Sequence, residues 1–525
     1  MVDSPPCSLL RGNRLPRYGW FMARRGWFGI GSVAGLGRRE AREGLVLSGG
    51  GSKMGFQIGA LRYLYDRELL HPDVIVGTSA GAILTAMLAQ SSDLDDQRAA
   101  IAELERLWLG MSRQSDMFTE RTWFRRFRER GPEVITLLQR EEGKDMFGAV
   151  RRLPKISLSF TNGFTIDPDD QQQRTDGPTP PEQAPMTPEE ETLALATSDP
   201  DVVGSEFTAT QVMALVSGLG RMRGVGSDLG VILRGAQTTR SMYIPGPILR
   251  DLLGTGLFTS QRVAGSGVTT RIAMVALESG ELRFMREDGT LVDREDNPIG
   301  EDPQDFSRGV LASCSIPTVF QPVRLGQEHY VDGGIRENLP AEMAIGPLGC
   351  TTTWVVSSNA PKVRPNDSYA SKDMFAIMMR ATEIQSDESE RDEVAYARSA
   401  GAIVIEPELD IHDALTIDPG LVRINMDYGW MRAAEVHQQA TVAETALNRS
   451  IIQARRRAWE LERDFLDPKR PHEEAEVLLL ARLKYDLREQ VPRQRPELLP
   501  EEAEQWWTRW EGHATSPTVN APWMV

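Results

Sequence analysis

Cysteine and histidine are scarce in this chain. Its 525 residues include three cysteines and six histidines. The cysteines, at positions 7, 314 and 350, are too few for a disulfide framework and do not have the spacing of metal ligands. We therefore expect no disulfide scaffold, no metal site and no cofactor.

Positive charge and long apolar runs are also in short supply. The formal net charge is −16, so no overall basic field attracts phosphates, and we expect no nucleic-acid partner. No apolar run reaches the roughly 18 residues of a membrane span, and arginines interrupt every candidate signal-peptide core. These absences predict a cytoplasmic protein, whose only contact with a membrane would be peripheral.

The N-terminal segment, residues 1–43, departs from this acidic balance. It carries eight arginines against three acidic residues, interleaved with aromatic residues such as Trp20 and Trp27. Two interpretations stand. One is a basic-aromatic anchor for an anionic membrane, and the other is a true start at Met22. For residues 1–21 we favour the second.

The first motif that carries chemistry is Gly-Thr-Ser-Ala-Gly at residues 77–81. An apolar run precedes it and a helical stretch follows, which is the strand, turn and helix order of a nucleophile elbow. Gly77 and Gly81 remove the Cβ atoms that would clash where the chain reverses around a strained residue. We therefore expect Ser79 to be a nucleophile at a helix N-terminus, whose dipole favours a negatively charged oxygen.

The second motif is the run Gly49, Gly50, Gly51, Ser52 and Lys53, again between an apolar strand and a helical pattern. Consecutive glycines let backbone N–H groups turn into a cavity, as an oxyanion hole requires. The order Ser-Lys-Met does not fit a nucleotide P-loop, and the glycine spacing is one residue too wide for a dinucleotide fingerprint. Three roles stay open for Lys53: orienting the loop, meeting an anionic head group, or lying in solvent.

The third motif is Asp332 followed by Gly333 and Gly334. A short apolar strand ends at the aspartate, and the glycine pair permits a turn with positive φ. Upstream, residues 311–317 are typical of a helix end that runs into a loop stopped by proline. The motif predicts a carboxylate on a turn, able to reach a serine elsewhere.

Together these motifs resemble the patatin-like phospholipase family. That family has a glycine-rich oxyanion loop with a basic residue, a G-x-S-x-G elbow, and an Asp-Gly-Gly or Asp-Gly-Ala acid after an Ala-Ser-x-x-x-Pro type of loop. The matching segments here are 49–53, 77–81, 312–317 and 332–334. The resemblance covers roughly residues 44–360. One departure is Met54, since the family usually has glycine directly after the basic residue.

The resemblance implies a serine acyl hydrolase of the lipase or phospholipase A type. Asp332 would accept the Ser79 proton, Ser79 would attack an acyl ester of a lipid, and the glycine loop would bind the oxyanion. An aspartate with a pKa of roughly 3.9 is a poor base at neutral pH. We therefore expect Asp332 to be partly desolvated, which would raise its pKa.

Two alternatives differ from this hypothesis. An α/β-hydrolase esterase would need a histidine after the acid. His412 and His437 have the right order for that triad but lack the flanks of a catalytic loop, and His329 lies an odd number of strand positions from Asp332. The other alternative is a catalytically weak lipid-binding or regulatory module, suggested by Met54 and by a long acidic insertion.

The alternation of apolar strands and helical patterns predicts a three-layer α/β/α fold around a mostly parallel sheet, with the site at the carboxyl ends of the strands. The strands are expected at 45–47, 74–76, 271–277, 281–285, 352–357 and 402–405. The helices are expected at 53–69, 80–90, 428–466 and 472–511, with one or two at 370–399 and another after Ser92 or Asp93. The expected organisation is a segment 1–43, a catalytic domain 44–360 with an insertion at about 110–265, a packed region 361–470, and a charged helical tail 471–525.

Two further segments carry expectations. Residues 167–201 have seven prolines and ten acidic residues against one arginine, which is typical of a disordered or lid-like stretch. Residues 121–128 form a basic-aromatic cluster, either an ordinary amphipathic helix or a peripheral membrane contact. The tail tryptophans at 506, 507 and 510 could dock on the core, pair subunits or contact lipid, and we favour docking on the core.

Overall fold

The structure is a computed structural model. It describes residues 41–126, 128–129, 186–197, 241–253, 256–361, 374–465, 469 and 473–511. The N-terminal segment up to residue 40 and most of the acidic stretch 167–201 lie outside the described residues. Residues 41–525 form one compact unit.

Among the described residues, nine strands form one mixed sheet in the order β11-β10-β1-β2-β5-β6-β7, with β9 paired to β5 and β8 paired to β9. The strands from β11 to β5 run parallel, and the remaining pairs are antiparallel. Their bounds are β1 Glu43–Leu47, β2 Val74–Thr78, β5 Thr269–Ala276, β6 Leu282–Met285, β7 Leu291–Val292, β8 Val323–Leu325, β9 Glu328–Asp332, β10 Thr352–Val356 and β11 Ile403–Ile405. A separate pair joins β3 Phe118–Glu120 to β4 Tyr243–Pro245.

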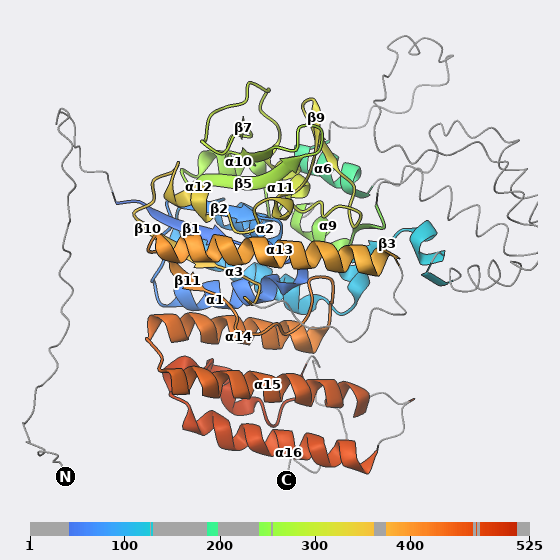
Figure 1. The fold of residues 1–525 in the computed structure, drawn as a ribbon, viewed down its shortest axis with the longest axis vertical. Helices are drawn as coiled ribbons and strands as arrows, with labels where there is room; N and C mark the ends of the chain where they lie inside the picture. Colours follow the sequence, from blue (N-terminus) through green and yellow to red (C-terminus); the bar gives the residue numbers. More distant parts are fainter. Residues whose placement is uncertain are drawn as a thin grey trace, which may run out of the picture. The chain divides into compact units, whose positions relative to one another are not determined.

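Helices flank this sheet (Figure 1). Their bounds are α1 Met54–Asp66, α2 Ala80–Leu88, α3 Leu94–Gly110, α6 Pro188–Thr197, α9 Pro247–Leu253, α10 Ser260–Gly265, α11 Phe306–Ser313, α12 Ala341–Ile345, α13 Met374–Ser399, α14 Pro419–His437, α15 Val442–Phe465 and α16 Glu474–Gln490. Asp93 caps α3 through bonds to the amides of Asp95 and Asp96.

Alternate strand residues enter two different apolar clusters. Leu45 and Leu47 belong to a cluster with α1, α2, α3 and α14, whereas Val46 packs with α12 and α13. Successive side chains of a strand point to opposite faces, so the two clusters are the two sides of the sheet. The expected three-layer α/β fold with a mostly parallel sheet is confirmed.

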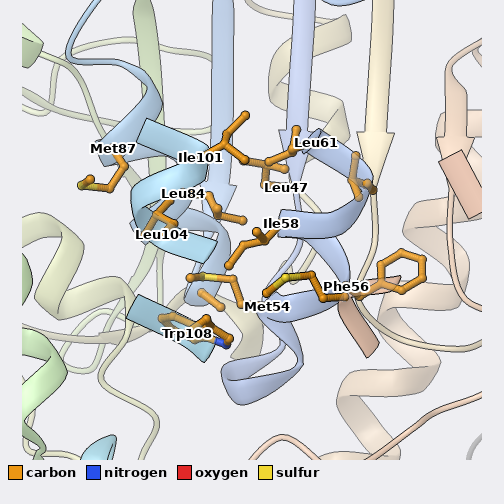
Figure 2. Close-up of a cluster of buried hydrophobic side chains, with 14 of the residues drawn as sticks. Leu47, Met54, Phe56, Ile58, Leu61, Leu84, Met87, Ile101, Leu104 and Trp108 are labelled. Atoms are coloured by element: carbon orange, nitrogen blue, oxygen red, sulfur yellow. The ribbon is translucent and has the colours of Figure 1, made fainter. Parts of the chain in front are cut away.

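Met54, which stands where the family usually has glycine, belongs to the first of these clusters. Met54 is fully buried at the start of α1 and packs among Ile58, Leu84 and Trp108 (Figure 2). Its side chain therefore fills the core below the glycine loop. Because the Met54 side chain lies in the core, a bulky residue directly after Lys53 is compatible with an intact glycine loop.

Two helices cross at unusually close range. A Cβ added to Gly59 of α1 would fall on the carbonyl oxygen of Met426, and one added to Gly429 of α14 would fall on that of Phe56. The crossing therefore depends on glycine from both sides. It attaches α14 to the helix that begins at the glycine loop.

The C-terminal helices continue from α14, with α15 and α16 stacked in succession below it (Figure 1). Trp506 and Trp510 are buried, which confirms the expected docking of the tail on the core. Arg455 of α15 is fully buried between Asp427 and Glu511 and lies against the Trp506 ring, 3.8 Å from its centroid. Lys484 of α16 pairs with the buried Glu462.

Three sequence expectations need correction. The single helix expected at 428–466 is two helices, α14 and α15, which separate near Gln439, a residue with φ of 51°. The helix expected at 472–511 ends at Gln490, because prolines at 492, 496 and 500 allow only short 3₁₀ turns beyond it.

The third correction concerns residues 188–197, which lie in the stretch expected to be disordered. They form helix α6. Thr187 and Glu190 exchange hydrogen bonds as a capping box, Pro188 takes the first helical position, and Thr192 and Ala196 are buried. Local capping and burial therefore outweigh the acidic composition of this segment.

Candidate active site

Strand β5 brings Ser79 and Asp332 together. Its residue Ala273 pairs with Thr78, the last residue of β2, and the next residue, Met274, pairs with Asp332, the last residue of β9. Because β6 occupies the other edge of β5 at Met274, β2 and β9 lie on one edge and approach each other end to end. The serine after β2 and the acid of β9 therefore meet.

The serine sits on a strained turn. Ser79 has φ of 54° and ψ of −121°, a region that side-chain-bearing residues rarely adopt. Such strain costs on the order of 1–3 kcal/mol and persists where the surroundings enforce it. A Cβ on Gly77 would collide with the Gly81 carbonyl, and one on Gly81 would collide with that of Leu47. The two glycines thus permit the tight reversal that the motif predicted.

The last residue of α11 and the loop after it hold the turn in place. The Ser79 amide donates to the Ser313 hydroxyl over 2.9 Å, and that hydroxyl donates to the Ala273 carbonyl over 2.6 Å. The Cys314 thiol donates to the Ser79 carbonyl at 3.2 Å. The Ser315 carbonyl accepts the amide of Asp332 at 3.1 Å. One short segment therefore fixes the backbone of both the serine and the acid.

The two side chains lie close to each other. The Ser79 hydroxyl is near enough to the Asp332 carboxyl to act on its pKa as a hydrogen-bond donor, and the carboxylate accepts the Gly334 amide at 2.8 Å. Each residue is 5% exposed. Burial raises the pKa of Asp332 to about 6, although the bonds from Ser79 and Gly334 act in the lowering direction. At neutral pH the carboxylate is thus mostly ionised yet far more basic than an exposed aspartate.

The glycine loop packs against this pair. A Cβ added to Gly49 would lie 3.1 Å from Cβ of Ser79. The Gly49 amide is already bonded to the Asn338 carbonyl at 3.0 Å. In the part of the chain that the structure describes, the amides of Gly50 and Gly51 have no hydrogen-bond partner. Gly51 has φ of 56° and lies against the backbone of Ala414. Among the three glycine amides of this loop, that of Gly49 is therefore engaged, and the oxyanion role predicted for the loop would fall to Gly50 and Gly51.

A model of the family described as "Patatin-like phospholipase" matches residues 45–345. The match covers more than half of the chain and includes the glycine loop, Ser79 and Asp332. This chain belongs to the patatin-like phospholipase family.

Curated relatives match a smaller part. Patatin-like phospholipase domain-containing proteins from two strains of Cryptococcus neoformans var. neoformans serotype D, B-3501A and JEC21, are each 36% identical over 93 residues. These residues are 18% of this chain and 10% and 9% of the two relatives. The chain thus spans about a tenth of the length of the curated relatives it matches.

Solved structures align over most of the patatin-like chain at low similarity. VipD from Legionella pneumophila is 14% identical with a TM-score of 0.30, covering 90% of this chain and 91% of VipD. The ExoU chain of the ExoU–SpcU complex from Pseudomonas aeruginosa is 14% identical with a TM-score of 0.21, covering 89% and 68%.

Lys53 is buried beneath the patatin-like glycine loop. Its ammonium lies 3.4 Å from the Asp410 carboxylate, and its carbonyl accepts the Asn425 amide at 3.2 Å. Of the three roles left open for this residue, the structure therefore excludes a position in solvent. The contacts with Asp410 and with α14 favour the loop-orienting role, which stays a prediction.

The histidines contact other groups. Nδ1 of His412 lies 2.9 Å from the Asp413 carbonyl and 3.5 Å from the Ser52 hydroxyl. Burial lowers the pKa of His412, which favours its neutral form. His437 bonds to Tyr63, and His329 bonds to Glu278. None of these rings contacts Asp332, whose described side-chain partners are Ser79 and Gly334.

The basic-aromatic cluster at 121–128 is partly internal. Arg121 and Trp123 are buried and bond to Ser241, and Phe124 packs edge-on to Tyr243. Arg125 and Arg128 are exposed. The peripheral membrane contact stays a prediction, and these two arginines are the side chains through which it would act.

Two absences concern the described residues alone. No helix among them is long and apolar enough to cross a membrane. They also contain no group of three or more side chains able to hold a metal ion.

Sequence reasoning missed the residues that support the glycine loop. Asn338, Asn359 and Glu390 surround Gly49 from segments after the acid motif. Asn338 could have been noticed as a polar residue directly before the Leu-Pro pair that opens the next helix. Glu390 gave no signal, since it looks like any charged residue on a helix.

Proposed function

We propose that this protein is a serine acyl hydrolase that cleaves acyl esters of lipids through a Ser79–Asp332 dyad. The observation that carries the proposal is the placement of Ser79, by the register of β5, beside a buried carboxylate whose pKa is raised to about 6. An unpaired aspartate in water is too weak a base for this role. Burial makes Asp332 a stronger base, so the proposed reaction needs no histidine.

In the proposed reaction, Asp332 takes the proton of Ser79 as the serine oxygen bonds to the ester carbonyl carbon. The carbonyl oxygen becomes an oxyanion and accepts hydrogen bonds from the amides of Gly50 and Gly51. Collapse of this intermediate breaks the ester bond, and the alcohol leaves with the proton from Asp332. Water then attacks the acyl-serine, with Asp332 again as base, and releases the fatty acid and free Ser79.

The lipid substrate is supported by membership of the patatin-like phospholipase family. Apolar residues near the acid are consistent with an acyl chain. Ile335, three residues after Asp332, is 41% exposed although its side chain is large and apolar. Phospholipids and lysophospholipids are therefore the first substrates to test.

The test compares hydrolysis of a short-chain p-nitrophenyl ester and of phosphatidylcholine vesicles by the full chain, Ser79→Ala and Asp332→Asn. We expect kcat to fall by about 10⁴-fold or more in Ser79→Ala, and Asp332→Asn to lose most activity. Ser399→Ala, which changes an exposed serine on α13, is the matched control and should keep wild-type rates.

Equal activity in Ser79→Ala and wild type would overturn the dyad. An inactive wild-type protein that still sediments with the vesicles, equally in Ser79→Ala, would favour the lipid-binding module instead. Cleavage of the soluble ester but not of phosphatidylcholine would retain the hydrolase and reject this lipid class.

A further inference from the structure

A buried carboxylate on α13 lies behind the glycine loop. Glu390 is 3% exposed and lies beyond the segment that the family model matches. Its carboxyl accepts the side-chain amides of Asn338 at 2.6 Å and Asn359 at 2.5 Å, and pairs with the Ser357 hydroxyl at 2.5 Å. Burying a carboxylate costs free energy, so buried glutamates are found mainly where other groups satisfy their hydrogen bonds. All three partners of Glu390 belong to segments next to the loop.

The two asparagines that Glu390 holds also reach the carbonyl oxygen of Gly49. Asn359 donates to it at 3.3 Å and Asn338 at 3.5 Å. The hydroxyls of Ser358 and Ser48 donate to the same oxygen at 2.7 Å and 2.9 Å. This carbonyl is thus surrounded by four donors, far more than an ordinary loop carbonyl receives.

Fixing this carbonyl fixes the next amide. The peptide between Gly49 and Gly50 is planar and trans, so its C=O and N–H point in opposite directions. Glycine offers little resistance to rotation of that peptide, so the loop itself does not hold it. The donors around the Gly49 carbonyl therefore set the direction of the Gly50 N–H, which points away from them.

We propose that Glu390 is a positioning residue for the oxyanion hole, acting through Asn338 and Asn359 on the peptide between Gly49 and Gly50. This role rests on the proposed function, because it concerns an amide that matters only if an oxyanion forms. Glu390 touches neither Ser79 nor any reacting atom. Its effect is to keep both asparagine amides turned with their NH₂ groups toward the carboxyl and the Gly49 carbonyl.

The surroundings of Glu390 indicate which replacement is conservative. Burial raises its pKa, against the hydrogen bonds from Ser357, Asn359 and Asn338 and the nearby charge of Lys53. A neutral side chain is therefore tolerated at this position. Glutamine keeps the shape and retains one oxygen for the two asparagine amides, whereas alanine removes every bond.

The experiment measures kcat and KM on the soluble ester for Glu390→Ala and Glu390→Gln in the full chain. A misdirected Gly50 amide stabilises the transition state less but changes substrate binding little. We therefore expect Glu390→Ala to lower kcat about 10- to 100-fold with KM little changed. Glu390→Gln should recover most of the loss. Glu435→Ala is the matched control, because Glu435 is also buried and bonded to an asparagine, Asn448, but lies near the C-terminal end of α14, beyond the Asn425 that reaches the loop.

Hydrogen exchange of residues 48–53 gives a readout that needs no turnover. We expect faster exchange there in Glu390→Ala than in Glu435→Ala at equal global stability. A fall in kcat no larger than that of Glu435→Ala, or a loss that lies entirely in KM, overturns the positioning role. If the wild-type protein hydrolyses no ester and a fluorophosphonate does not label Ser79, the proposed function fails. Unchanged exchange of residues 48–53 in Glu390→Ala would then reject the role of Glu390 by itself.

Discussion

At the scale of single residues, the chemistry depends on how the surroundings change a common side chain. Asp332 is an ordinary aspartate on a turn, and its raised pKa comes from burial. Ser79 lies beside it, close enough for its hydroxyl to act against this rise in pKa. On an exposed surface the carboxylate would keep an ordinary aspartate pKa, and it would be too weak a base to take the serine proton.

This raised pKa predicts the pH dependence of turnover. Asp332 must be ionised to act as a base, so kcat/KM should rise about tenfold per pH unit below pH 6 and level off above it. Initial rates on an uncharged soluble ester, from about pH 4.5 to about pH 8.5, would measure the profile. Circular dichroism at each pH would control for unfolding. A midpoint near the ordinary aspartate value would show that Asp332 is not desolvated during catalysis.

At the scale of elements, α14 secures the helix that carries the glycine loop. Gly59 and Gly429 allow α1 and α14 to touch, backbone against backbone. The Asn425 amide on α14 then reaches the Lys53 carbonyl, and the loop before α14 accepts the Ser52 amide through Ala414 at 2.9 Å. Elements C-terminal to the family match therefore support the loop from the side opposite to α13.

The crossing predicts different results for two glycines of one helix. Gly59→Ala should push α1 from α14 and lower the free energy of unfolding by about 1–3 kcal/mol or more, since the new methyl meets backbone. Gly55→Ala is the control. Its Cβ would lie 3.4 Å from the nearest atom, the Val422 carbonyl oxygen, so the helix should be stabilised or unchanged. Urea unfolding of both variants measures the difference, and equal stabilities would contradict the role of the crossing.

At the scale of the whole molecule, many acidic groups are buried rather than exposed. Burial raises the pKa of four carboxyls to values between about 6 and about 8: Asp332, Asp387, Glu337 and Glu393. These groups ionise in the unfolded chain near pH 4 but keep their protons in the folded chain to higher pH. Between those values the folded state binds more protons, so stability falls as pH rises.

We therefore expect the melting temperature to increase as the pH is lowered from about 8 to about 5. His412, whose pKa is lowered by burial, acts in the opposite sense. Burial also raises the pKa of further carboxyls besides these four: Glu390, Asp427, Glu435 and Glu462. Differential scanning calorimetry across this range measures the trend. Glu393→Gln should flatten it, because among these four carboxyls the pKa of Glu393 is raised furthest, to about 8. A melting temperature that decreases steadily toward pH 5 would contradict this account.

Short-range patterns in the chain were sufficient to predict the parts of the site. A serine between Gly77 and Gly81, three consecutive glycines after an apolar strand, and Asp332 before a glycine pair each depend on backbone conformation within a few residues. Strands and helices near these motifs were predictable for the same reason. The errors came where Gln439 and the late prolines ended helices, and where α6 formed within an acidic segment. A single sequence carries such local preferences directly.

The assembly of those parts depends on contacts between residues far apart in the chain. The register of β5 brings Thr78 and Asp332 to neighbouring positions, and the Asn338 carbonyl accepts a hydrogen bond from the Gly49 amide. Glu390 acquires its place only when α13 packs beside the loop. Strand register and long-range hydrogen bonds are chosen by the packing of the entire core. No local pattern of residues specifies them, so they became visible only in the folded chain.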